Sequence, residues 1–198
     1  MLHLNKLMKQ IFHKIAAVSA KTWLYLFAVT AVICVISLRH NNQTMTRLRD
    51  QVYAADKNNG DINGALNNLR SYVFAHMNTS LSTGTNIKPP IQLKYTYQRL
   101  YDAAYNDLQT ANQKIYNDGK NACPGIANGY DPARLACIEN YAVNHGVQGA
   151  NINIPAGLYE FDFVSPSWSP DLAGWTLLLS GVFFVAFLLK LAAASLKK

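Results

Sequence analysis

The sequence predicts a mostly α-helical membrane protein, in which two transmembrane helices flank an antiparallel helical bundle outside the cytoplasm. Two runs of 17 residues, 22–38 and 173–189, contain no charged side chain. A helix needs roughly 17–25 apolar residues to cross a bilayer. The 134 residues between these runs (39–172) suffice for one compact domain, and their apolar residues recur at helical spacing. This pattern excludes a soluble enzyme and a large multi-pass transporter.

The distribution of charge predicts the orientation in the membrane. The net charge is +7, yet residues 39–172 hold 11 Lys and Arg against 11 Asp and Glu and are therefore neutral. Because basic flanks stay on the cytoplasmic side, we expect both termini in the cytoplasm and 39–172 outside the plasma (inner) membrane. The neutral middle section also argues against nucleic acid as a partner and leaves the lipid bilayer. The excess charge lies entirely in the tails, at Lys6, Lys9, Lys14, Lys21, Lys190, Lys197 and Lys198.

The two tails, 1–21 and 190–198, are too short for a signalling domain. The first is predicted to form a basic amphipathic helix, with its apolar face made by Leu4, Leu7, Met8, Ile11, Phe12, Ile15 and Ala16. Val35 and Ser37 would suit the cleavage site of a secretory signal peptide, but the apolar run and the basic region before it are both long for one. We therefore expect an uncleaved anchor. Residues expected to hold the spans at the membrane surfaces are Lys21, Trp23, Trp168, Trp175 and Lys190.

The external bundle (39–146) is predicted to contain four helical segments. The first span continues to about Lys57 with a narrow, coiled-coil-like seam, made of Met45, Leu48, Val52 and Ala55. A second helix starts after an Asp61 N-cap and ends between Asn78 and Leu81, before a loop over 82–91. The third and longest helix covers Gln92 to Asp118, and Gly119 is available to close it. The fourth starts at Asp131-Pro132, reaches about Asn144 and ends at Gly146.

The segment 147–172 is predicted to be an extended strap before the second span, because Pro155, Pro166 and Pro170 exclude a continuous helix. Tyr159, Phe161 and Phe163 alternate with acidic residues, which is typical of a short strand. Two interpretations stay open. The strap is either a collar where the chain enters the membrane, with Trp168 and Trp175 in the headgroup layer, or a docking strip that adds to the sheet of a partner protein.

The three cysteines fit this topology. Cys34 lies within the first span, where it serves as a small apolar residue. Cys123 and Cys137 are both external and separated by a loop with several Gly and Pro residues, which predicts a disulfide. Metal binding is the rival, but two thiols without a suitably spaced histidine are too few for a site.

No pattern of catalytic residues occurs in the sequence. The two glutamates, Glu139 and Glu160, do not pair with another carboxylate at a catalytic spacing, and no nucleophile elbow, HExxH, P-loop or GxGxxG is present. His76 lies on the apolar face of the second helix, where a hydrogen-bonded core histidine is the commoner role. We expect no enzyme activity, no cofactor and no metal.

Two resemblances bear on function. The plan of span, external helices and span resembles the ligand-sensing half of bacterial chemoreceptors, although nine residues stand here in place of the cytoplasmic transducer. Separately, the segments 67–73, 76–78 and 165–170 (NNLRSYV, HMN and SPSWSP) resemble two-span membrane proteins of unassigned activity from small-genome bacteria. The second resemblance implies a bacterial plasma membrane and no particular activity.

These observations favour a structural or interaction subunit that presents its external bundle to a membrane or envelope protein, or to another copy of itself. The alternative is a ligand-sensing module that signals through a separate partner. It requires a polar pocket between helices, for which the available residues are Arg70, Tyr72, His76, Tyr97 and Tyr101. A membrane-anchored enzyme and an oligomeric pore rank below both, since neither span contains a buried Asp, Glu or Arg.

Overall fold

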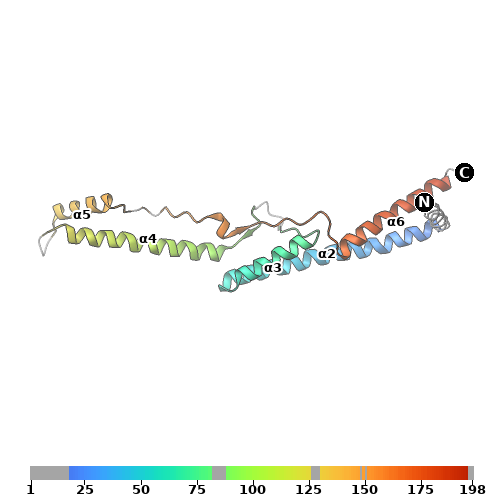
Figure 1. Cartoon of the computed structure of the whole chain (residues 1–198), viewed down its shortest axis with the longest axis horizontal. Helices are drawn as coiled ribbons and strands as arrows, with labels where there is room; N and C mark the ends of the chain where they lie inside the picture. The colour runs from blue at the N-terminus through green and yellow to red at the C-terminus, as the bar shows by residue number, and fades with distance from the viewer. Residues whose placement is uncertain (1–17, 82–87, 126–129, 148, 150, 196–198) are drawn as a thin grey trace, which may run out of the picture. The chain divides into compact units, whose positions relative to one another are not determined.

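A computed structural model describes residues 18–81, 88–125, 130–147, 149 and 151–195 of the chain. Most of the predicted amphipathic helix over 4–20, most of the predicted loop after Leu81, and Lys197 and Lys198 lie outside these residues. The described chain is mostly α-helical, as predicted, and Figure 1 shows its elements in sequence colours. It folds as two units, the first made of 18–52, 62–81 and 163–195, and the second of 53–61 and the described residues of 88–162.

Two helices of the first unit are long and apolar enough to cross a bilayer: α2 (Ala20–Asn58) and α6 (Leu172–Ser195). They contain the predicted spans 22–38 and 173–189. Their ring contacts join Trp23 to Phe183 and Phe27 to Phe184, while the Cys34 thiol lies 3.8 Å from the Ala173 carbonyl oxygen at the opposite end. The two helices therefore run antiparallel. The residues buried between them are small, as is usual for helix pairs in membranes, and include Cys34, Ser37, Ala173, Thr176 and Ser180.

The third helix of this unit, α3 (Ile62–Ala75), begins directly after Asp61 and buries Leu66, Leu69 and Val73. It ends earlier than the predicted Asn78–Leu81, so that boundary was wrong. Asn78 adopts a left-handed backbone conformation (φ 60°), which a continuing helix does not allow, and its side-chain amide donates to the Leu38 carbonyl of α2. The segment after α3 is thereby held beside Leu38 in the middle of α2.

A polar cluster joins α2, the segment after α3 and the start of α6. The Asp171 carboxylate accepts hydrogen bonds from the Gly174 N–H (2.9 Å), the Asn41 amide (2.8 Å) and the Ser169 hydroxyl (2.9 Å). Desolvation opposes ionisation of this carboxyl, but these hydrogen bonds and the nearby His76 outweigh it and lower the pKa of Asp171 below its ordinary value. The Ser169 hydroxyl oxygen also accepts from the Met77 N–H at 3.0 Å. Asp171 is therefore both the N-cap of α6 and a link between the helices.

The second unit is built on α4 (Lys94–Ala122) and α5 (Pro132–Asn144), which lie side by side (Figure 1). The Asp131 N-cap of α5 is confirmed, because its carboxylate accepts from the N–H groups of Ala133 and Arg134. The predicted end of α4 at Asp118 was wrong. Gly119 is a buried residue inside the helix, where an added Cβ would lie 3.1 Å from Tyr141 Cδ1 of α5. This glycine permits close packing of the two helices.

The extended strap also differs in part from its prediction. It contains a short 3₁₀ turn, Ala156–Leu158, and a strand β2, Glu160–Phe161, shorter than the predicted alternation of 159–163. β2 pairs antiparallel with β1, Ile91–Gln92, in the register Ile91 with Phe161. Residues 91–92 were assigned to a loop and a helix start, and that assignment was wrong because a two-residue strand is defined by its distant partner.

A single antiparallel bundle over 39–146 is not confirmed. Its predicted members divide between the two units, with α3 in the first and α4 with α5 in the second. Within the second unit, the apolar stripe of α4 is covered by α5 only near its C-terminal end. Beside Ala104, Leu108 and Ile115, the neighbouring residues that the structure describes are Gly149, Asn151 and Ile152. The coiled-coil seam of α2 likewise stays a prediction, although Met45 and Val52 are buried.

Candidate functional site

The N-terminal end of α4 is fixed by a side chain from another helix. Its own N-cap residue, Leu93, offers no capping oxygen. Instead the buried Asp56 carboxylate, in the last turn of α2, accepts hydrogen bonds from the N–H groups of Tyr95 (3.0 Å) and Thr96 (2.7 Å). The Arg99 guanidinium lies 3.2 Å from the same carboxylate and also donates to the Asp56 carbonyl. Asp56 therefore satisfies the free N–H groups of α4 and complements its helix dipole.

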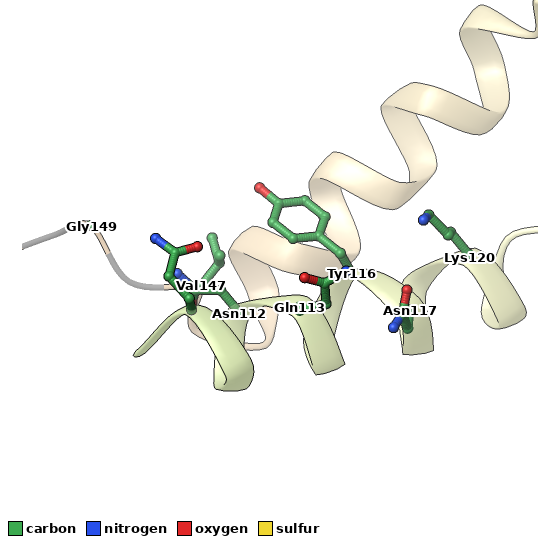
Figure 2. A pocket seen from close by; sticks show the side chains of 8 residues that line it. Asn112, Gln113, Tyr116, Asn117, Lys120, Val147 and Gly149 are labelled. Carbon is green, nitrogen blue, oxygen red and sulfur yellow. The ribbon is translucent and has the colours of Figure 1, made fainter. Parts of the chain in front are cut away.

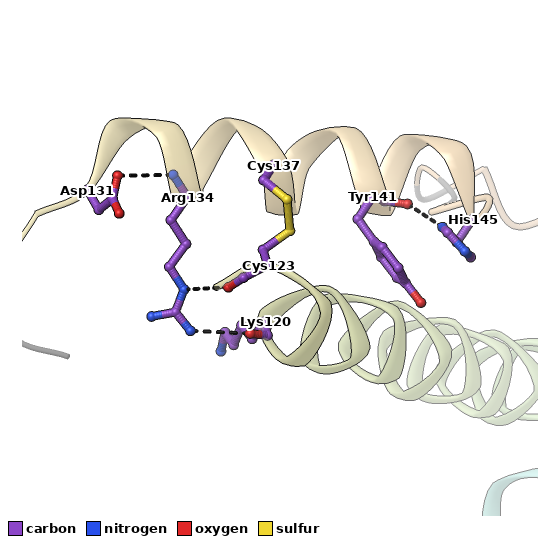
Figure 3. The surroundings of a disulfide bond; sticks show 7 residues. All are labelled: Lys120, Cys123, Asp131, Arg134, Cys137, Tyr141 and His145. Carbon is purple, nitrogen blue, oxygen red and sulfur yellow. Dashed lines mark hydrogen bonds between the residues drawn. A yellow bond between two sulfur atoms is a disulfide. The ribbon is translucent and has the colours of Figure 1, made fainter. Parts of the chain in front are cut away.

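The C-terminal end of α4 is fixed covalently. Cys123 and Cys137 form the predicted disulfide, with their Cα atoms 6.0 Å apart, and join the residue after α4 to the middle of α5 (Figure 3). Arg134 of α5 adds two hydrogen bonds, from Nε to the Cys123 carbonyl oxygen and from Nη2 to the Lys120 carbonyl oxygen. A cationic side chain on these terminal carbonyls is favoured by the helix dipole. Both ends of α4 are thus held in place.

Between these two ends, α4 carries a row of uncharged amide side chains, exposed except for the half-buried Asn112, which we call the amide face: Asn106, Gln109, Asn112, Gln113 and Asn117. Gln109, Gln113 and Asn117 separate two grooves. One, of about 530 Å³, is completed by Tyr116, Lys120, Val147 and Gly149 (Figure 2). The other, of about 730 Å³, is lined by α4 residues alone. The grooves therefore run along both sides of one exposed helix ridge.

The chemistry of the amide face suits hydrogen bonding to another polar surface. Each amide group provides two N–H donors and a carbonyl acceptor, with no charge to desolvate. Tyr116, which is 40% exposed, adds an aromatic ring of the kind that is enriched at protein interfaces. Small-molecule sites, by contrast, are concave and lined mostly by apolar side chains. The amide face therefore fits a macromolecule better than a small ligand.

The five residues predicted to form a ligand pocket fall in different units. Arg70, Tyr72 and His76 belong to α3 and the residue after it, where the Tyr72 and His76 rings stack at 4.0 Å and the His76 Nδ1 lies 3.0 Å from the Tyr72 carbonyl oxygen. Tyr97 and Tyr101 belong to α4 and stack on each other at 6.3 Å. None of the five lines the grooves beside α4.

The predicted docking strip is also divided. Tyr159 and Phe161 lie in the second unit, where the Tyr159 carbonyl accepts from the Leu93 N–H and its ring packs on Tyr97. Desolvation, followed by the Glu160 carboxylate, raises the pKa of the Tyr159 hydroxyl. Phe163 lies in the first unit and contacts Phe74. β1 of the same chain pairs with β2, so one edge of the short strand is already occupied.

The predicted membrane anchors lie at the ends of the long helices. Trp23 packs against Phe183 near the start of α2, and Trp168 and Trp175 pack against each other around the start of α6, at 5.8 Å. Lys21 is exposed in the first turn of α2, and Lys190 lies in the last two turns of α6. Among the described residues, no three His, Cys, Asp or Glu side chains are grouped closely enough to hold a metal ion.

The comparisons with known proteins returned no match: no family model, no curated protein and no solved structure is similar to this chain. The function must therefore be argued from the site itself. Sequence reasoning missed the capping role of Asp56, the role of Arg134 and the amide face. The amide face was visible as Asn and Gln at spacings of three and four along the third predicted helix.

Proposed function

We propose that this protein is a membrane-anchored interaction subunit of a bacterial envelope complex. In this proposal, α2 and α6 cross the plasma membrane, both tails are cytoplasmic, and the second unit presents the amide face of α4 to a partner protein outside. The antiparallel course of α2 and α6 supports tails on one side of the membrane, and their charge places that side in the cytoplasm.

One observation carries the interaction role: α4 is held at both ends while the amide face between them stays exposed. Asp56 and Arg99 hold one end, and the disulfide and Arg134 hold the other. A helix fixed in this way loses little conformational entropy when a partner binds, so more of the contact energy is available for affinity. The ligand-sensing alternative has no comparable support, because its predicted residues lie in separate units.

Site-specific photo-crosslinking in the native membrane tests the proposal. Benzoylphenylalanine placed at Gln113 should crosslink the partner, which mass spectrometry then identifies. Gln98 is the matched control, because it is an exposed amide on the same helix and lines neither groove. Replacing Gln109 by Arg should abolish the crosslink from position 113, since a charge that must be desolvated opposes binding. Equal crosslinking from both positions, or none from either, would contradict the proposal.

A further inference from the structure

At the end of α3, in the strap and in the first turn of α6, the described part of the first unit leaves apolar side chains exposed or half-buried. They form what we call the apolar collar: Phe74, Phe163, Val164, Trp168, Leu172 and Trp175. Phe74 is 50% exposed, Val164 77% and Trp168 40%. Exposed apolar groups of this size mark an interaction surface in most proteins.

The collar contains two aromatic pairs, one between α3 and the strap and one between the strap and α6. Phe74 of α3 meets Phe163 edge to face with ring centroids 6.2 Å apart, and Trp168 meets Trp175 in the same manner at 5.8 Å. The four residues between Phe163 and Trp168 connect the pairs. Each pair buries part of its rings internally and leaves the rest exposed, so the collar is ordered before it meets any partner.

The hydrogen bonds of Ser169 fix the position of the collar along the axis of α6, beside the first turn of that helix. Its hydroxyl oxygen contacts the Met77 N–H and the Asp171 carboxylate, and Asp171 caps the first turn of α6. The end of α3 therefore lies level with the start of the second span. Phe74 lies in the last turn of α3, three residues before Met77, and is therefore close to this level. The headgroup layer adjoins the hydrocarbon core at the ends of the spans.

The length of the first span also favours a position of the collar close to the hydrocarbon boundary. The uncharged run 22–38 extends over about 26 Å as a helix, whereas the hydrocarbon core of a bilayer is about 30 Å thick. A short span draws the adjoining residues toward the hydrocarbon boundary. At the outer end of this run, the Leu38 carbonyl accepts a hydrogen bond from the Asn78 side-chain amide, and the Asn41 amide donates to the Met77 carbonyl.

We infer that the apolar collar is a lipid-binding surface, which seats the first unit in the headgroup layer of the outer leaflet. Trp and Phe rings favour this layer, and the Arg70 guanidinium, 5.4 Å from the centre of the Phe74 ring, carries the charge that lipid phosphates attract. This inference rests on the proposed membrane anchoring. It adds that α3 and the strap touch lipid, in addition to the two spans.

Depth measurement by spin labels tests the inference on the full chain in phosphatidylcholine vesicles. In a Cys34→Ala background, single labels are attached at Phe74→Cys, Asn63→Cys and Leu179→Cys. Asn63 is exposed on the same face of α3, three turns or about 16 Å further from the end of the helix. Leu179 is exposed on α6 inside the second span.

The ratio of collision rates with oxygen and with a water-soluble nickel complex reports depth. We expect the ratio at position 74 to be several-fold higher than at position 63 and lower than at position 179. A water-like ratio at 74 with a lipid-like ratio at 179 overturns the collar inference and leaves the anchor intact. A water-like ratio at 179 overturns the membrane anchor itself.

Discussion

Thr96, at the start of α4, donates hydrogen bonds from both its N–H and its hydroxyl to the Asp56 carboxylate at the end of α2, each at 2.7 Å. The two residues are 40 positions apart in the sequence. Asp56 is only 2% exposed, and Arg99 provides the compensating charge. A helix cap that most proteins obtain from a neighbouring residue is obtained here from a different helix, and it ties the start of α4 to the end of α2.

Removing this cap should loosen the first turns of α4. Asp56→Ala leaves the N–H groups of Tyr95 and Thr96 and the Arg99 guanidinium without their acceptor, which corresponds to a loss of about 2–3 kcal/mol in unfolding free energy. Hydrogen exchange of residues 93–99 and urea unfolding in detergent measure the effect. Asp102→Ala is the control, because Asp102 is exposed on the same helix. Unchanged protection of 93–99 in Asp56→Ala would show that the contact does not hold the helix.

The disulfide should be intact in protein taken from membranes. Mass spectrometry of a non-reduced digest is expected to give the linked Cys123–Cys137 peptides. The Cys123→Ser, Cys137→Ser double variant should lose roughly 3 kcal/mol of unfolding free energy, because the bond closes a loop of about 15 residues in the unfolded chain. Cys34→Ala, which affects only the thiol in the span, serves as the control. Free Cys123 and Cys137 as the main species would refute the bond and count against an external location.

The first turn of α6 should accept only glycine at position 174. A Cβ there would collide with the Ser169 carbonyl oxygen, which is backbone and cannot rotate away. Gly174→Ala should therefore lower the melting temperature in detergent and disturb the Asp171 cap. Gly181→Ala in the same helix meets nothing within 4 Å and should be tolerated. Equal melting temperatures for the two variants would contradict the packing described for the start of α6.

The Asp171 cap predicts a pH dependence. Because its pKa is lower in the folded protein than in the unfolded chain, Asp171 stabilises the fold above its ordinary pKa of about 3.8. That contribution is lost as the pH falls through the lower, folded pKa. Wild type should therefore exceed Asp171→Asn in unfolding free energy at pH 7, and the difference should shrink on acidification below about pH 4. Asp50→Asn, at an exposed position of α2, is the matched control variant. A gap for Asp171→Asn that is constant with pH would contradict the role of its charge.

The sequence was most informative where the structure is local or strongly periodic. The two membrane-length apolar helices, the Asp131 cap and the continuation of the first long helix to about Lys57 follow from neighbouring residues. The disulfide followed from two thiols across a loop rich in Gly and Pro. The end of α4 could not be foreseen, because Gly119 looks like a helix terminator until Tyr141 is known to pack on it. The β1–β2 pair joins residues about 70 positions apart, and neither strand is long enough to be recognised alone.

The candidate site was predicted less well than the fold. Polar residues were grouped into one pocket on the assumption of a single bundle, and the division into two units separates Arg70 and His76 from Tyr97. The amide side chains of the third helix were not singled out. The contacts of Asp56 and Arg134 hold α4 at both ends, and this makes the amide face a candidate interaction surface.

The most direct test of the proposed anchoring is the accessibility of single cysteines to a membrane-impermeant maleimide in intact cells. In a Cys34→Ala background, Asp102→Cys reports the second unit and Ser195→Cys reports the end of α6; both positions are exposed. The proposal predicts labelling of position 102 in intact cells and of position 195 only after the membrane is permeabilised. Labelling of position 195 in intact cells, or protection of position 102, would contradict it.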